Sequence, residues 1–307
     1  GLTFLFLYNI CTGVFTALGD SRTPLYFLIA SSLANIVMDV VFVVCFHMGV
    51  GGVAWATFLC QGVASVLAAW TLFRRLRGVP APERHPLFSW RMLGRIARIA
   101  VPSILQQSFI SVGNLFIQSL VNSFGSAVVA GYSAAVKLNT FALTGFTTLG
   151  NGLSSFTAQN IGAGRPERVK QGFRAGAGMT LCVAMPLIAA FVFAGPQMVR
   201  LFLSAPSADA LAQGTLFLNI VAPFYVLISL KLAADGVLRG AGCMGQFMTA
   251  TFTDLILRVI LAFLLAPRFG AAGIWMSWPL GWAVAAALSL GFYFTGGWRK
   301  RVGSIDK

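Results

Sequence analysis

Long apolar stretches dominate this sequence, and they limit the folds that are open to it more than any other feature does. About nine blocks of 18 to 34 mostly apolar residues follow one another along the chain. As an α-helix, each block crosses a hydrocarbon layer of about 30 Å. None alternates apolar and polar residues over strands of about ten residues, as a membrane β-barrel does. The sequence therefore predicts an all-α integral membrane protein. The predicted spans are 1–18, 24–46, 51–73, 99–122, 127–160, 175–199, 211–234, 246–266 and 270–295.

Charged residues are few and lie mainly between the blocks. Only 10% of the 307 residues are charged, against about 25% in soluble domains, which excludes a water-soluble fold. The net charge of +14 does not indicate a nucleic-acid partner, because its distribution follows the spans. Seventeen Lys and Arg lie in alternate connections, and two, Arg200 and Arg268, lie in the others. Alternate connections lie on the same side of the membrane, and the positive-inside rule places the side with more Lys and Arg in the cytoplasm.

A glycine pattern near the start of the chain recurs near its end, which indicates an internal repeat. The matched glycines are Gly13, Gly19, Gly49 and Gly52 in the first copy and Gly236, Gly242, Gly270 and Gly273 in the second. The shift is 223 residues for the first two pairs and 221 for the last two. The first three spans therefore correspond to the last three of a six-helix unit. We expect three helices to precede Gly1, giving two six-helix halves in the same orientation, the parallel-repeat plan of secondary transporters.

This plan predicts the domain organisation of the chain. The predicted parts are 1–73, the second half of an N-terminal lobe; 74–98, a cytoplasmic linker; 99–298, a C-terminal lobe; and 299–307, a basic cytoplasmic tail. Pro80, Pro82 and Pro86 interrupt any helix in the linker. We expect the following stretch, 89–100, to form a short amphipathic helix in the membrane interface.

Several short motifs resemble those of the multidrug and toxic compound extrusion (MATE) transporters. They are Ala17-Leu18-Gly19-Asp20-Ser21-Arg22-Thr23-Pro24, Asn35-Ile36-Val37-Met38-Asp39, Gly51-Gly52-Val53-Ala54, Gln159-Asn160-Ile161-Gly162-Ala163-Gly164-Arg165 and Gly236-Val237-Leu238-Arg239-Gly240. The resemblance covers the whole chain, except that the family's first three helices are absent. It implies a twelve-helix antiporter with V-shaped lobes that exports lipophilic, often cationic compounds in exchange for H⁺ or Na⁺.

Asp39 is the candidate residue for cation coupling, together with Asn35 and Thr57. Asn35 precedes Asp39 by one helical turn, so both side chains share a face. Asp39 and Thr57 lie eight and seven residues from the turn between their spans, at a similar depth of about 11–12 Å. A carboxylate, an amide oxygen and a hydroxyl at one depth can hold Na⁺ or accept a proton. The resemblance implies the same role, while a structural alternative is that Asp39 bridges helices.

Polar residues in the later spans are candidates for a substrate cavity: Asp254, Lys137, Gln106 and Asn114. Asp254 and Arg258 are spaced i,i+4, as are Lys231 and Asp235, so each pair can neutralise its own charges. Lys137 has no partner nearby in sequence and can snorkel, pair with another helix or line the cavity. The MATE transporters that couple through the C-terminal lobe carry carboxylates in the helices that correspond to 99–122 and 211–234. Here these spans contain amides but no acid, so the resemblance disfavours coupling through the C-terminal lobe.

Aromatic and proline residues in the spans allow two interpretations. Trp275, Trp278 and Trp282 form one helical stripe, which we interpret as packing or an interfacial anchor rather than a surface for planar cations. Pro186 and Pro223 are either bending points or passive kinks. The five cysteines show no metal or disulfide pattern.

An efflux antiporter in the cytoplasmic membrane of a bacterium is the function that these features favour. No enzyme is expected, because the spans lack a cluster of catalytic side chains. A lipid-linked oligosaccharide flippase of the same superfamily is the alternative. We expect no cofactor beyond the coupling ion H⁺ or Na⁺, small-molecule and lipid partners, no nucleic acid, and a monomer.

Overall fold

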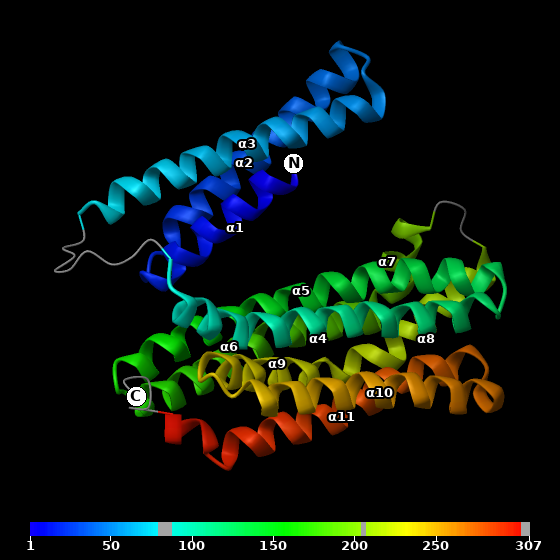
Figure 1. Cartoon of the computed structure of the whole chain (residues 1–307). Helices are drawn as coiled ribbons and strands as arrows, with labels where there is room; N and C mark the ends of the chain where they lie inside the picture. Colours follow the sequence, from blue (N-terminus) through cyan, green and yellow to red (C-terminus); the bar gives the residue numbers. More distant parts are fainter. Residues whose placement is uncertain (79–87, 204–206, 302–307) are drawn as a thin grey trace. The chain divides into compact units, whose positions relative to one another are not determined.

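Every regular element that the structure, a computed structural model, describes is a helix (Figure 1). Residues 1–78, 88–203 and 207–301 are described. The helices are α1 (Leu2–Ala17), α2 (Arg22–Val40), the π-helix η1 (Val41–Cys45), α3 (Gly49–Leu76), α4 (Trp90–Asn122), α5 (Ser126–Gly162), α6 (Pro166–Phe193), α7 (Gly195–Phe202), α8 (Ala208–Val221), the 3₁₀ turn η2 (Ala222–Phe224), α9 (Tyr225–Gly240), α10 (Met244–Phe269), α11 (Ala271–Phe294) and the 3₁₀ turn η3 (Gly297–Arg301).

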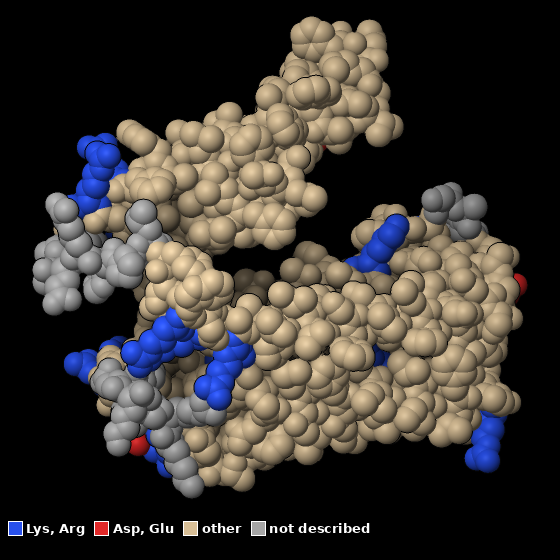
Figure 2. Space-filling model, in the orientation of Figure 1, with Lys and Arg blue, Asp and Glu red and all other residues tan. Residues whose placement is uncertain are grey.

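The chain is an integral, multi-pass membrane protein. In the described part, seven helices or helix pairs are long and apolar enough to cross a membrane, and α1 is a shorter apolar helix. None of the most apolar window of α2 is buried within the protein, and large apolar side chains such as Leu33, Ile36 and Leu115 are exposed. In the face that Figure 2 shows, basic residues gather at the helix ends and leave a broad surface with few charged atoms between them. Such surfaces require lipid rather than water.

Three differences between the helices and the predicted spans change the interpretation of the sequence. Helix α4 begins at Trp90 and continues without a break through Pro102, so the prediction of a separate interfacial helix over 89–100 is wrong. Span 175–199 is also wrong, because α6 ends at Phe193 and α7 follows it. The third difference is a 3₁₀ turn at Pro223 inside span 211–234, where the ring removes a backbone donor. The three linker prolines lie outside the described residues.

Two compact units make up the chain, Gly1–Phe88 and Ser89–Lys307. In the first, α3 packs along α1 and α2. In the second, α5, α9 and α11 surround a core that includes Trp275, Tyr225 and Phe217.

The glycines of the predicted repeat have matching conformations in the two units. Gly19 and Gly242 both have positive φ, at 79° and 71°, and so do Gly49 and Gly270, at 55° and 62°. Positive φ strains residues that carry a Cβ, so glycine is preferred at these helix ends. Helices α1–α3 and α9–α11 therefore end and turn in the same way, as expected of two copies of one three-helix unit.

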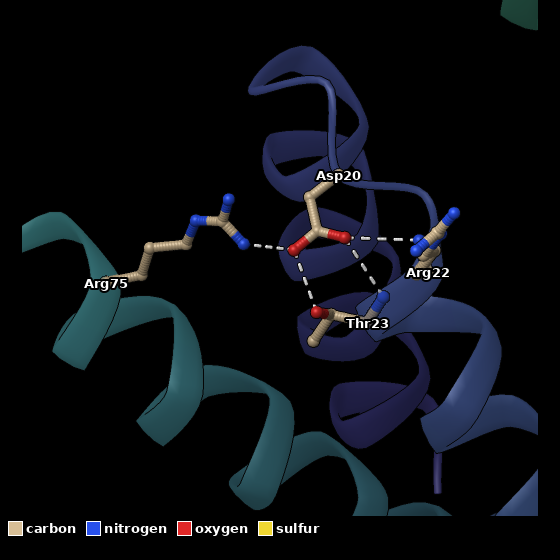
Figure 3. Close-up of polar contacts among 4 residues, drawn as sticks. All are labelled: Asp20, Arg22, Thr23 and Arg75. Atoms are coloured by element: carbon tan, nitrogen blue, oxygen red, sulfur yellow. Dashed lines mark hydrogen bonds and ion pairs between the residues drawn. The ribbon is translucent and has the colours of Figure 1, made fainter.

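Asp20 joins the ends of the three helices of the first unit (Figure 3). Its carboxylate accepts hydrogen bonds from the backbone amides of Arg22 and Thr23 at the start of α2 and from the Thr23 hydroxyl. The guanidinium of Arg75, at the end of α3, forms an ion pair with it. The Thr23 amide and hydroxyl, and then Arg75, hold the pKa of Asp20 below its usual value.

We expect Asp20→Asn to lower the melting temperature of the protein in detergent by a small amount at neutral pH. Folding lowers the pKa of the Asp20 carboxyl, so the ionised carboxylate stabilises the folded protein. This stabilisation is complete above the pKa of the unfolded state, about 3.9, and is lost as the pH falls through the pKa of the folded state. The difference from wild type should therefore shrink in acid. Arg75→Gln should also lower the melting temperature, whereas Arg77→Gln is the control. An equal difference at pH 7 and pH 3 would contradict this account.

Candidate functional site

A small pocket of about 200 Å³, with a mainly apolar wall that carries a few polar groups, lies within the first unit between α1, α2 and α3. Asn35 and Thr57 both line it, and the Asn35 amide nitrogen donates a hydrogen bond to the Thr57 hydroxyl at 3.4 Å. Tyr8 and Gln61 add further polar atoms to the wall. The structure thus brings together two of the three predicted cation-coupling residues, which come from different helices.

Asp39 lies one helical turn beyond Asn35 but does not line this pocket. Its Oδ1 atom is buried and has no hydrogen-bond partner among the described residues. The π-helical segment Val41–Cys45 begins two residues later. Such segments are rare and frequently occur at functional sites. Burial without a partner is costly for a carboxylate, so this oxygen is suited to a proton or a cation.

A larger cavity of about 560 Å³ lies within the second unit. Amides and hydroxyls from α4 and α5 line one side of it, and charged and aromatic side chains from α9, α10 and α11 line the other. The polar, charged and indole residues of the wall are Gln106, Gln107, Asn114, Gln118, Tyr132, Asn139, Thr140, Thr147, Asn151, Lys231, Asp235, Arg239, Thr251, Asp254, Arg258, Trp278 and Trp282. The mixture of amides and rings can contact a lipophilic molecule that also carries polar groups.

Glycines of α5 and α9 allow these two helices to approach each other closely beside this cavity. A Cβ at Gly236 would collide with the backbone oxygen of Gly150, and a Cβ at Gly150 would lie 2.8 Å from the oxygen of Leu232. Small residues at such crossings are typical of membrane helix packing. Lys231, Asp235 and Arg239 therefore lie on a helix that is held directly against α5.

Charged groups on α9 are paired. The Lys231 ammonium lies 2.7 Å from Asp235, whose other oxygen accepts a hydrogen bond from Ser289 at 2.6 Å. Arg239 donates to Asn151 at 2.6 Å. The predicted pairing of Lys231 with Asp235 is confirmed.

The pair on α10 is looser. Asp254 and Arg258 are 4.0 Å apart, farther than a hydrogen bond allows, although both side chains are more than 90% buried. The guanidinium carbon of Arg258 lies 4.6 Å from the centre of the Trp278 ring. Asp254 Oδ1, Arg258 Nε, Trp278 Nε1 and Thr251 Oγ1 are buried, and none has a partner in the described ranges.

Three of the four predicted cavity residues line the cavity, and one does not. Gln106, Asn114 and Asp254 line the cavity, but Lys137 is exposed on α5 and does not. The tryptophan stripe is buried packing, and Trp278 and Trp282 also face the cavity.

Arg239 is a cavity residue that the sequence does not identify, because it falls between the predicted spans 211–234 and 246–266. It lies in the last turn of α9, and its side chain reaches the cavity. The glycines at 236 and 240 were the available signal, because small residues bring α9 close to α5 at this point.

Comparisons with known proteins agree on one family. The family model MatE matches residues 102–264. The chain is 31% identical over 300 residues to the probable multidrug resistance protein YpnP of Bacillus subtilis (strain 168), covering 97% of this chain and 66% of that protein. It is 26% identical over 303 residues to the probable multidrug resistance protein YoeA of the same organism, covering 95% and 65%. The chain therefore spans about two thirds of the length of these relatives.

Solved structures show the same fold. One is the outward-facing conformation of a multidrug resistance MATE family transporter of the MOP superfamily, with a TM-score of 0.84 and 23% identity. The match covers 97% of this chain and 66% of that one.

Proposed function

Because the chain belongs to the MatE family, we propose that the protein exports lipophilic compounds, cations among them, across the bacterial cytoplasmic membrane in exchange for H⁺ or Na⁺. The first unit takes the coupling ion and the cavity of the second unit takes the substrate. In this arrangement 1–73 and 99–298 belong to two lobes of a monomer, joined by the cytoplasmic linker 74–98.

The buried oxygen of Asp39 is the observation that supports coupling. A carboxylate inside an apolar helix is costly and needs a function or a partner. Its Oδ1 has no hydrogen-bond partner in the described part of the chain, and the Asn35–Thr57 pair lies one turn away. When an ion binds to this site or leaves it, the balance between two conformations of the helices can shift. Exchange transport requires such a shift.

Transport in proteoliposomes tests the function. We expect ethidium to move against its gradient when a pH or Na⁺ gradient is imposed, and to stop when an ionophore collapses that gradient. The effective ionophore identifies the coupling ion. Movement of a labelled lipid-linked sugar in place of ethidium would instead indicate the flippase. Ethidium movement that depends on neither the pH gradient nor the Na⁺ gradient would contradict antiport.

A further inference from the structure

The pocket of the first unit and one side of the second-unit cavity occupy equivalent positions in the repeat. The shift of 223 aligns Ser31 with Asp254 and Asn35 with Arg258, and the shift of 221 aligns Thr57 with Trp278. Eight of the ten residues that line the smaller pocket correspond in this way to residues that line the larger one. The counterparts in the larger cavity are Ile228, Lys231, Thr251, Asp254, Leu255, Arg258, Trp278 and Trp282.

The chemistry of the two sites is opposite. In the first unit, the amide of Asn35 and the hydroxyl of Thr57 offer oxygens to a cation. Their counterparts are a guanidinium, which only donates hydrogen bonds, and an indole, which donates through Nε1. The counterpart of Asp39 at a shift of 223 is the fully buried Ala262. The second copy thus carries a permanent cation where the first can bind an exchangeable one.

Arg258 has the loosest polar contacts of the three cations in this wall. Lys231 is held by Asp235 at 2.7 Å, and Arg239 by Asn151 at 2.6 Å. Asp254 lies 4.0 Å from Arg258, and its Oδ1 atom lies close to α11, where a Cβ at Gly281 would be 2.5 Å from it. The three basic and two acidic residues of the cavity wall leave an excess of one positive charge.

Three residues whose donors are unpaired in the described part of the chain line this cavity: Arg258, Trp278 and Thr251. Arg258 Nε and Trp278 Nε1 are buried and have no acceptor among the residues that the structure describes, and the Thr251 hydroxyl is also unpaired. The Trp278 ring supports the guanidinium face, which fixes the plane of its N–H groups. A planar guanidinium with a fixed orientation matches the two oxygens of a carboxylate or the oxygens of a phosphate.

We propose that Arg258, with Trp278 and Thr251, forms a subsite that binds an oxyanion group of the transported molecule. This subsite rests on the proposed function, since it takes the cavity as the substrate site. The transported compounds then include lipophilic molecules with an acidic group, and zwitterions whose basic group lies near Asp254. The two copies of the repeat then bind different ions: the first binds a cation, and the second binds an oxyanion.

A matched pair of dyes tests the subsite. Rhodamine 110 carries a free carboxylate, and rhodamine 123 is its methyl ester. The full-length protein in phosphatidylcholine nanodiscs, without any gradient, should bind rhodamine 110 about tenfold more tightly by fluorescence anisotropy, the size expected for a charge-assisted hydrogen bond. Arg258→Gln should remove this preference, and Arg258→Lys should retain part of it.

The control is Lys137→Gln, which removes the same charge from an exposed position outside the cavity and should keep the preference. If Arg258→Gln does not fold, the double variant Asp254→Asn/Arg258→Gln removes the pair together and should also lose the preference. Equal binding of both dyes by wild type, or an unchanged preference in the variants, would overturn the subsite. Displacement of rhodamine 110 by added phosphatidylglycerol would assign the subsite to a lipid instead.

Failure of the subsite and failure of the proposed function are separable. The binding assay uses no gradient, so the Asp39→Asn protein should keep the dye preference even though it cannot couple. If the wild-type protein prefers rhodamine 110 but shows no gradient-driven transport, the result contradicts antiport and leaves the oxyanion subsite intact.

Discussion

Under an imposed pH or Na⁺ gradient, proteoliposomes that contain the Asp39→Asn protein are expected to move ethidium no faster than protein-free liposomes. The substitution keeps the size of the side chain and removes its titratable charge. An amide cannot exchange a proton near neutral pH, and it binds Na⁺ more weakly than a carboxylate does. Exchange of labelled for unlabelled ethidium without a gradient should continue, because that exchange does not require the coupling ion.

The matched control is Asp209→Asn, in the exposed first turn of α8. It makes the same chemical change away from any apolar helix interior, and it should transport as wild type does. If Asp39 only bridges helices, Asp39→Asn would instead lower the melting temperature and leave gradient dependence intact in the folded fraction. Wild-type coupling by the Asp39→Asn protein would direct attention to Asp235 and Asp254.

Gly236→Ala is expected to produce a large loss of stability. A Cβ at this position would meet the backbone oxygen of Gly150 in α5, and its next contacts are the carbonyl carbon and Cα of the same residue at 3.2 and 3.4 Å. Backbone atoms inside a helix cannot move away as the end of a side chain can. Overpacking of this kind costs about 1–3 kcal/mol or more. Separation of α5 from α9 would also displace Lys231 and Asp235, so substrate binding should fall with stability.

The control is Gly152→Ala on the same α5 helix, where nothing lies within 4 Å of the added Cβ. Alanine favours a helix over glycine by about 1 kcal/mol, so this variant should melt at the wild-type temperature or slightly above it. Fluorescence-detected size exclusion after heating measures both variants. Equal melting temperatures for Gly236→Ala and Gly152→Ala would show that the helix crossing is not as tight as the structure indicates.

Local features of the sequence predicted most of the architecture and the charge pairs. Block length and apolar composition predict membrane helices, because the bilayer sets the length of a span. The recurring glycines identify the repeat, because a turn of positive φ favours glycine, which has no Cβ. The pairing of Lys231 with Asp235 could be predicted because both residues lie on one helix, one turn apart. The helix breaks after Phe193 and at Pro223 were harder to place, since an apolar stretch is apolar on both sides of a break.

Only the tertiary structure determined which polar groups meet across helices. Arg239 bonds to Asn151, 88 residues away, and Asp254 lies against Gly281 of α11, whose missing side chain leaves room for its carboxylate. Lys137 and Asn139 are two residues apart on α5, yet one is exposed and the other is buried against Tyr225. Sequence spacing gives relative angles around a single helix but not the rotation of that helix toward its neighbours. That rotation depends on the packing of side chains from distant parts of the chain.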